Sequence, residues 1–309
     1  MVNRFKQFLI DNNSFVDLDF TRATLEEKSS WYHFLKETAR QDLSLGHCLQ
    51  HHQSARYSVQ LSNAEDIKSY LSCQPNFDAI GSNSVKKSTD SCKISNRTIT
   101  GEKKYISNLG FADFHVLWIG DDDEHDVKVV FVKDKVRGLY KDLSFNPMGM
   151  EETQTGKIIF DSVVDYTVLF SLSDVQHGMR NHIQNFSFCT VSLGLCLGLL
   201  DDIEQIVIQK KLQLELSIHA YRQELKIFTE AWEHLFPSLM MQCYDKTTSH
   251  KVHRIYSQLK RMIIDLIKVL LEIGDSRHTQ AGKESQRFRD AITYATHRQN
   301  YYTSLVHYY

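Results

Sequence analysis

The chain has 309 residues, of which 42% are apolar and 24% charged, and its formal net charge is −2. This composition is ordinary for a soluble globular protein, and the near-neutral charge provides no electrostatic footprint for nucleic acid. The first thirteen residues lack a sustained apolar core and a small-residue cleavage site, so no signal peptide is expected. The six cysteines show no metal-binding spacing, which favours free thiols and a cytoplasmic location.

The first part of the chain, residues 1–70, is predicted to be helical. Helices are expected over residues 25–38, where Trp31, Phe34 and Leu35 lie on one side, and over residues 43–61. Residues 72–93 are polar, with many serines, and are expected to form loops between short strands.

Three histidines, His47, His51 and His52, lie close together on the second of these helices. His47 and His51 are spaced i, i+4, so both fall on one face, as the two histidines of a helical metal site do. No carboxylate lies between them to serve as the base of a metalloprotease. Packing or polar-pocket histidines are therefore the preferred interpretation, and no metal is predicted.

The middle of the chain is predicted to be a β-domain, because short β-prone segments recur at even spacing, as in a sandwich or barrel. These segments are residues 92–96, 98–100, 103–107, 114–119 and 127–132. Gly101-Glu102 is interpreted as a turn, and residues 108–110 as a break after the strand that ends with Ser107. Such a break aims hydroxyl, amide and backbone N–H groups at a planar ligand. The acidic turn at residues 121–126 lacks the glycine and distal glutamate of a calcium loop, so a solvated hairpin tip is expected.

After residue 170 the apolar spacing becomes helical. Residues 186–200 form an apolar run shorter than the about 20 residues that a membrane span needs. A helix buried in a bundle is expected, with Gly194 and Gly198 allowing a close neighbour. Two apolar stripes follow, the first ended by Pro237, and a last helix completes a predicted antiparallel four-helix bundle.

Three stretches carry a family resemblance. The first is Thr-Gly-Glu-Lys-Lys-Tyr-Ile-Ser-Asn at residues 100–108, and the second is the run from Met148 to Val163. The third is Gln-Arg-Phe-Arg-Asp at residues 286–290, followed by His297. Together they resemble the acyl-CoA dehydrogenase superfamily, and the distal histidine is typical of its flavin monooxygenase-like branch.

The resemblance implies an α+β multidomain fold. Its three regions are a short N-terminal helical region at 1–70, a middle antiparallel β-domain at 71–166 and a C-terminal four-helix bundle at 167–309. The N-terminal region is shorter than in the superfamily, no carboxylate matches the dehydrogenase base, and the Arg-x-x-x-Phe-Gly flavin signature is absent.

The resemblance also implies a cofactor, FAD or FMN, and a set of site residues. Ser107 and Asn108 are expected at the flavin edge, and His51 or His52 in the flavin or substrate pocket. Arg287 and Arg289 are candidate ligands of the flavin phosphate, and simple pairing with Asp290 and Glu284 is the preferred alternative. His297 is the candidate acid–base residue, and a surface histidine late in a terminal helix is the alternative.

The function implied is a flavin-dependent oxidoreductase acting on an acyl-CoA or another small organic molecule. The alternatives are a reduced-flavin-dependent monooxygenase and a degenerate, non-catalytic relative that binds flavin or a partner. A homo-oligomer formed through the C-terminal bundle is expected, because the superfamily's flavin sites lie near subunit interfaces. The aromatic tail is also costly to leave in water as one patch; it contains Tyr301, Tyr302, Tyr308 and Tyr309.

Overall fold

The protein is described by a computed structural model over residues 4–12, 16, 18–73, 81–84, 91–124, 126–145, 149–240, 246–273 and 283–297. The aromatic tail after residue 300, the start of the second resembling stretch at Met148 and the side chain of His297 lie outside this description.

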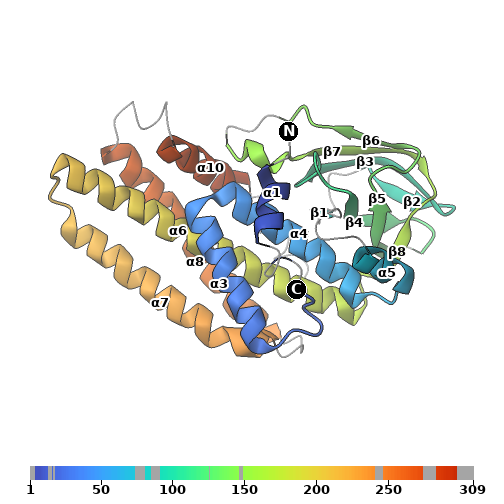
Figure 1. The fold of residues 1–309 in the computed structure, drawn as a ribbon, viewed down its shortest axis with the longest axis horizontal. Coiled ribbons are helices and arrows are strands. Elements are labelled where there is room, and N and C mark those ends of the chain that lie inside the picture. Colours follow the sequence, from blue (N-terminus) through green and yellow to red (C-terminus); the bar gives the residue numbers. More distant parts are fainter. Residues whose placement is uncertain are drawn as a thin grey trace. The chain divides into compact units, whose positions relative to one another are not determined.

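Helices come first along the chain, then strands, then helices again (Figure 1). The helices are α1 (Arg4–Asp11), α3 (Leu25–Gln41), α4 (Leu43–Leu61), α5 (Glu65–Cys73), α6 (Val175–Lys210), α7 (Glu215–Met240), α8 (Lys246–Ile273) and α10 (Lys283–His297), with a short 3-10 turn, η1, at Glu151–Thr153. The strands are β1 (Gly81–Ser84), β2 (Lys93–Ser95), β3 (Thr98–Ile106), β4 (Phe114–Asp121), β5 (Asp126–Lys133), β6 (Leu139–Asp142), β7 (Gly156–Val163) and β8 (Thr167–Ser171). The predicted mixture of helical and β regions is confirmed.

The chain divides into two compact units, each assembled from separate stretches. Unit 1 comprises Met1–Trp31, Cys48–Asn146 and Thr153–Gln184, and unit 2 comprises Tyr32–His47, Pro147–Glu152 and Asn185–Tyr309. The three regions predicted from the sequence have different boundaries, because they were drawn where helices give way to strands and strands to helices. The division into three domains stays a prediction.

Unit 1 is built on one sheet with the strand order β6-β7-β3-β2-β4-β5-β8, and β1 pairs in parallel with β4. The longest uninterrupted pairing joins β4 to β5, from Phe114 opposite Lys133 to Asp121 opposite Asp126. The predicted strand at residues 98–100 and the one at 103–107 are a single strand, β3. The expected turn at Gly101 is therefore wrong. Gly101 has a φ of 99° and the register shifts beside it, so this glycine allows a bulge within the strand.

Alternate residues of β4 face two different cores, as a strand buried on both sides requires. Phe114, Val116 and Trp118 face the core that α4 and α5 cover. Leu117 and Ile119 face a second core, which also holds side chains of β3, β5 and β7. The sheet therefore has no face along β4 that is left to solvent.

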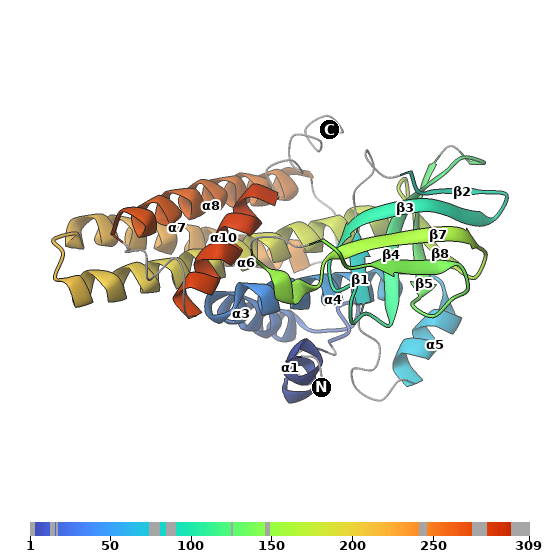
Figure 2. The ribbon, with the colours of Figure 1, turned by 90° about the horizontal axis from the view of Figure 1, so that it is seen from above.

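Unit 2 is helical around an aromatic cluster in which Tyr32, Phe186 and Phe236 surround Trp232. Helices α7 and α8 run beside α6 in both views (Figure 1, Figure 2). A Cβ on Gly194 would lie 2.3 Å from the carbonyl oxygen of Lys36. The close approach predicted for the α6 glycines is therefore confirmed.

Two expectations about helices need correction. Pro237 does not end α7, which continues to Met240. A proline so near the C-terminus disturbs only the last turn, where few hydrogen bonds remain to be lost. The apolar run at 186–200 is part of the 36-residue α6, which is long and apolar enough to cross a membrane, but 89% of its most apolar window is buried in the protein.

Candidate functional site

The first group of predicted site residues lies where β3 ends, at Ser107 and Asn108. Asn108 has a φ of 67°, in the left-handed region that asparagine tolerates better than most residues. Its side-chain Nδ2 donates to the carbonyl of Cys48 at 2.9 Å and to that of Gly81 at 3.3 Å, while its backbone N–H donates to the carbonyl of Thr153 at 2.9 Å. The predicted break is thus a turn held by α4, by β1 and by the end of η1.

This arrangement leaves the acceptor atom of the Asn108 side chain unsatisfied. The orientation of the amide is fixed, because only the NH₂ group can face two carbonyl oxygens. Oδ1 is buried and has no hydrogen-bond partner among the residues that the structure describes. A buried acceptor without a donor costs about 1–3 kcal/mol, so a ligand that offered an N–H or O–H here would be stabilised.

His52 of α4 also contacts Gly81 of β1. Its Nδ1 accepts a hydrogen bond from the backbone N–H of Gly81 at 3.2 Å. Burial, with the nearby charge of Arg56, holds the pKa of His52 well below its usual value, so the ring is neutral and its proton lies on Nε2. This Nε2 also has no partner within the described parts of the chain, and Phe5 packs edge-on against the ring. A buried donor on His52 and a buried acceptor on Asn108 are therefore both anchored to the backbone of Gly81.

The other two histidines of α4 are placed differently. His51 is also buried, but it lies one residue before His52 and so about 100° around the helix axis. His47 belongs to unit 2, where its ring packs edge-on against Tyr294 with the ring centroids 6.0 Å apart. Among the described residues, no group of three or more histidine, cysteine, aspartate or glutamate side chains is placed to hold a metal ion.

A circuit of hydrogen bonds in unit 1 supports the turn after β3. The hydroxyl of Ser82 lies 2.6 Å from Nδ1 of His115, and Nε2 of His115 lies 2.8 Å from Oδ1 of Asp134. Asp134 also pairs with Lys141 at 2.8 Å, and the ammonium of Lys141 donates to the carbonyl of Leu109 at 3.3 Å. Since Leu109 follows Asn108 and Ser82 follows Gly81, the circuit closes on the turn.

The protonation of this circuit follows from its chemistry. An ionised Asp134 can only accept, so His115 carries its proton on Nε2 and accepts the Ser82 hydroxyl proton at Nδ1. Burial lowers the pKa of His115 below its usual value, against the opposing effect of Asp134. Burial would raise the pKa of Asp134, but the hydrogen bonds of His115 and Lys141 outweigh it and keep that pKa below its usual value. The sequence interpretation missed these residues, although a histidine inside the apolar run of β4 is a signal of a satisfied buried group.

Tyr105, two residues before Ser107, forms an exposed aromatic pair with Phe145. The rings of Tyr105 and Phe145 meet edge to face with centroids 5.6 Å apart, and they are 42% and 41% exposed. Tyr105 has a φ of 58°, which is unusual for an aromatic residue in a strand. The pair gives unit 1 an apolar surface beside the turn, which a planar ligand could cover.

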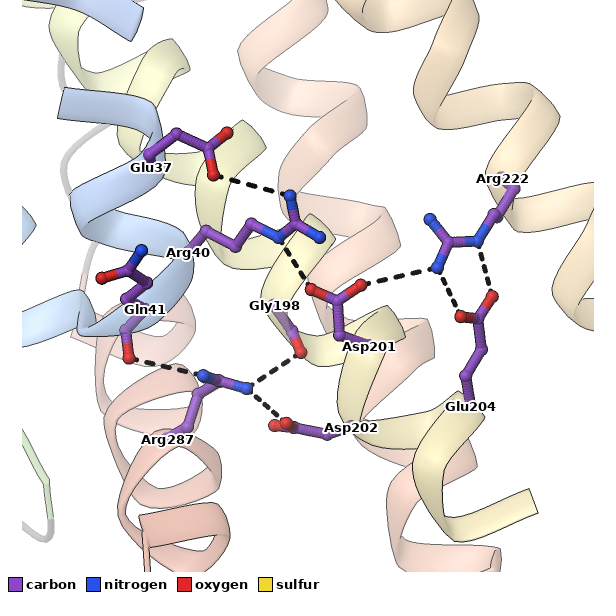
Figure 3. Close-up of polar contacts among 9 residues, drawn as sticks. All are labelled: Glu37, Arg40, Gln41, Gly198, Asp201, Asp202, Glu204, Arg222 and Arg287. Atoms are coloured by element: carbon purple, nitrogen blue, oxygen red, sulfur yellow. Dashed lines mark hydrogen bonds and ion pairs between the residues drawn. The ribbon is translucent and has the colours of Figure 1, made fainter. Parts of the chain in front are cut away.

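The remaining predicted site residues lie in unit 2, and Arg287 is held there by a polar network (Figure 3). Its guanidinium donates to the carbonyl of Gly198 at 3.0 Å, to the carboxylate of Asp202 and to the carbonyl of Gln41 at 3.3 Å. These partners come from α3 and α6, while the side chain of Glu284, the other partner considered from the sequence, lies outside the described residues. A role of Arg287 in joining α3, α6 and α10 needs no ligand.

Asp290 is a buried carboxylate of the third resembling stretch. It is 3% exposed, and its carboxylate accepts from the backbone N–H of Met150 at 2.6 Å, from Nε2 of Gln286 at 2.7 Å and from the hydroxyl of Ser44 at 3.1 Å. Burial nevertheless raises its pKa above the usual value. Asp290 therefore ties α10 to the start of α4 and to the segment before η1.

Two further candidates lie on α10. The guanidinium of Arg289 donates to the side-chain oxygen of Gln286, one turn earlier on the same helix. His297 is the last residue of α10. The predicted site residues thus fall into two groups, one in each unit.

The chain finds no match among protein-family models or among curated protein sequences. Solved structures do match. The dibenzothiophene monooxygenase TdsC from Paenibacillus sp. A11-2 is 17% identical with a TM-score of 0.72, and the methanesulfinate monooxygenase MsuC from Pseudomonas fluorescens is 15% identical with a TM-score of 0.74. Butyryl-CoA dehydrogenase from Megasphaera elsdenii is 14% identical with a TM-score of 0.70. Each of these matches covers 86% of this chain and 78% of the other.

These matches define the class of fold. The chain has the fold of the acyl-CoA dehydrogenases and of the monooxygenases that share their architecture. The resemblance noted in three short stretches of sequence is confirmed at the level of the fold.

Proposed function

We propose that the protein is a flavin-dependent oxidoreductase that binds FMN or FAD at the turn after β3. The observation that carries this proposal is the pair of unsatisfied buried groups at Gly81, the acceptor Oδ1 of Asn108 and the donor Nε2–H of His52. The edge of an isoalloxazine ring presents both donors and acceptors, so it matches such a pair, and the hydroxyl of Ser107 adds a further polar group.

Two structural relatives strengthen the choice of cofactor. TdsC has been solved with FMN, and with FMN and indole together. KijD3, which is 12% identical with a TM-score of 0.68, has been solved with FMN and a deoxysugar nucleotide. A bound flavin would supply the redox chemistry, while the chain would orient it and hold protons at defined atoms.

Flavin binding is tested by titrating the protein with FMN and with FAD and following flavin fluorescence. We expect saturable binding at concentrations up to about tens of micromolar, and a weakening of about tenfold in Asn108→Gly, because one hydrogen bond to the ligand is lost. Glycine accepts the positive φ of this position, so the variant removes the side chain without backbone strain. Asn96→Gly is the matched control, since Asn96 has a φ of 50° but is exposed. Absence of saturable binding by the wild type contradicts the proposal.

The proposal next concerns the type of reaction, dehydrogenation or monooxygenation. An acyl-CoA dehydrogenase would bleach its flavin without oxygen when an acyl-CoA is added, whereas a monooxygenase would consume oxygen only with reduced flavin. The sequence has no carboxylate at the dehydrogenase base position, which favours the monooxygenase. If neither activity is found and flavin still binds, the protein is a non-catalytic flavin binder.

We propose His297 as the acid–base residue of this reaction, because an imidazole exchanges protons near neutral pH. His297→Ala and His297→Gln are expected to lower turnover by about 10²–10⁴-fold while flavin binding is kept. His219→Ala removes an exposed histidine of α7 and is the matched control. Wild-type turnover in both His297 variants excludes the role.

A homo-oligomer formed through an antiparallel bundle of α6, α7, α8 and α10 completes the proposal. Ile208 and Ile227 are 76% and 62% exposed on α6 and α7, and burying them in an interface would be favourable. Light scattering should therefore give a mass of at least twice that of the chain. A mass near 36.0 kDa across micromolar concentrations excludes the oligomer.

A further inference from the structure

The middle of α4 carries a second set of buried polar atoms without partners. Gln50 is completely buried, and both Oε1 and Nε2 of its amide lack a hydrogen-bond partner among the residues that the structure describes. A buried serine of the same helix is satisfied locally, since Ser58 donates to the carbonyl of Ser54 at 2.9 Å. Removing an amide from water without a new partner is unfavourable, so Gln50 presents an acceptor and an NH₂ donor to a ligand.

Gln53 adds a third unsatisfied atom, one turn further along α4. Its Nε2 donates to the carbonyl of Leu18 at 3.2 Å, and this fixes the amide, because only the NH₂ group can face a carbonyl oxygen. Oε1 of Gln53 is buried and has no partner within the described parts of the chain. Side chains three residues apart are neighbours on a helix surface, so Gln50 and Gln53 together offer two acceptors and one NH₂ group.

Aromatic rings continue this face of α4. Tyr57 follows Gln53 by four residues, which places it on the same face, and it is buried. Its ring lies against that of Phe20 with centroids 5.9 Å apart, and Phe20 packs edge-on against Trp31 at 5.2 Å. All of these residues belong to unit 1. The face thus combines apolar aromatic surface with a few neutral polar groups, the combination that small-molecule sites use.

We propose that Gln50 and Gln53 form a binding site for a planar aromatic carboxamide. A primary amide pairs with the amide of Gln50 through two hydrogen bonds, because each group has a donor and an acceptor side by side. The second N–H of the ligand is then left for Oε1 of Gln53. Neither glutamine carries a charge that would offset an ion, so the ligand is neutral, and Tyr57 and Phe20 favour a planar ring.

This site is separate from the proposed flavin site. His52 lies two residues after Gln50 and therefore about 200° around the axis of α4. On that side of the helix His52 accepts from Gly81, whereas Gln53 donates to Leu18, which is half-buried and brings the site close to solvent. Carboxamide binding therefore does not rest on flavin binding and goes beyond the function proposed above.

Binding is tested by ¹⁹F NMR of 4-fluorobenzamide added to the protein without flavin. We expect a saturable broadening and shift of the fluorine signal. The matched ligands are 4-fluoroacetophenone, which has a similar shape but no N–H, and 4-fluorobenzoate, which is charged and also lacks an N–H. Both should bind at least about tenfold more weakly, because they leave the acceptor oxygens of the two glutamines unsatisfied.

Gln50→Leu assigns the binding to this site, because it keeps a side chain of similar size and removes both hydrogen-bonding groups. We expect it to abolish saturation. Without ligand it should raise the urea midpoint, because no unsatisfied amide remains, whereas a purely structural glutamine would give a lower midpoint. Gln223→Leu, at an exposed position of α7, is the matched control for binding. Gln50→Met decides if Gln50→Leu does not fold.

Each result either supports or overturns the proposal. Saturable binding of 4-fluorobenzamide that the ketone does not match and that the Gln50 variants abolish supports the site. Absence of saturable binding by the wild type overturns the proposal. Equal binding of 4-fluoroacetophenone overturns it as well, and so does unchanged binding in the folded Gln50 variants or a lowered midpoint in both of them. Because no flavin is present, failure here leaves the flavin proposal untouched.

Discussion

The imidazole of His115 donates from Nε2 to the carboxylate of Asp134 across 2.8 Å, and the histidine is fully buried while the carboxylate side chain is 16% exposed. The pair therefore joins the interior of the sheet to its surface. Ser82 on one side and Lys141 on the other extend it into the circuit that holds the turn after β3. The circuit reaches the neighbours of both Asn108 and Gly81, because Lys141 donates to the carbonyl of Leu109 and Ser82 directly follows Gly81.

The His115–Asp134 pair makes the stability of unit 1 depend on pH. Because the folded pKa of His115 is lowered, the unfolded chain takes up a proton as the pH falls through about 6.5 and the folded chain does not. The contribution is therefore fully present above that value and is lost below it. Asp134, whose pKa is also lowered, adds a further loss at more acidic pH. Urea unfolding from about pH 8 to pH 5 should show this decline.

His115→Gln is the variant that tests this dependence, because glutamine can both donate and accept but does not titrate. We expect a loss of about 1–3 kcal/mol at neutral pH, and a flatter pH profile than in the wild type. His219→Gln, on the exposed face of α7, should leave the profile unchanged. Parallel profiles for wild type and His115→Gln would show that another group is responsible.

Asp290 should give unit 2 a pH dependence of the opposite sign. Its folded pKa is raised, so the folded chain holds a proton that the unfolded chain has released, and stability falls as the pH rises from about 4 through the folded pKa. Asn does not titrate, so Asp290→Asn lacks this decline, and the difference in unfolding free energy between wild type and variant should change over this pH range. Asp265→Asn, at an exposed position of α8, is the control. A difference curve that stays flat over this range contradicts the assignment.

The glycines of α6 should be intolerant of alanine. An added Cβ on Gly194 would lie 2.3 Å from the carbonyl oxygen of Lys36, and one on Gly198 would lie 2.5 Å from that of Arg40. Alanine usually stabilises a helix relative to glycine by about 1 kcal/mol, so a loss of about 1–3 kcal/mol here reverses the normal sign. Gly120→Ala, where nothing lies within 4 Å, is the control in denaturant unfolding. Stabilisation by Gly194→Ala would show that the helices move apart without cost.

Arg287 can be tested for a structural role against a cofactor-binding role. Breaking its contact with Asp202 by Arg287→Met or Asp202→Asn should lower stability, and a double-mutant cycle should give a coupling of about 0.5–3 kcal/mol. If Arg287 serves only this network, Arg287→Met and Asp202→Asn should have the same small effect on flavin affinity. A loss of flavin affinity in Arg287→Met that Asp202→Asn does not share would support the phosphate role predicted from the resemblance.

The local pattern was sufficient to predict the break after β3. Turn-forming residues interrupt an alternating strand there, and the chain has few other ways to continue. The helix predicted over residues 43–61 has the bounds of α4. Gly101 shows where this reasoning fails, since a glycine permits either a turn or a bulge, and the pairing of β3 with β7 selects the bulge.

The sequence by itself thus determined the succession of helices, strands and helices, the fold resemblance and the candidate residues Ser107 and Asn108. Only the tertiary structure decided which polar atoms are satisfied. Asn108 meets Gly81, His115 meets Asp134 and Arg180 meets Trp118 through strand pairing and helix packing across long sequence separations. Periodicity reports which face of an element is apolar, but the partner of a buried donor or acceptor depends on which elements pack together, and that is a property of the whole fold.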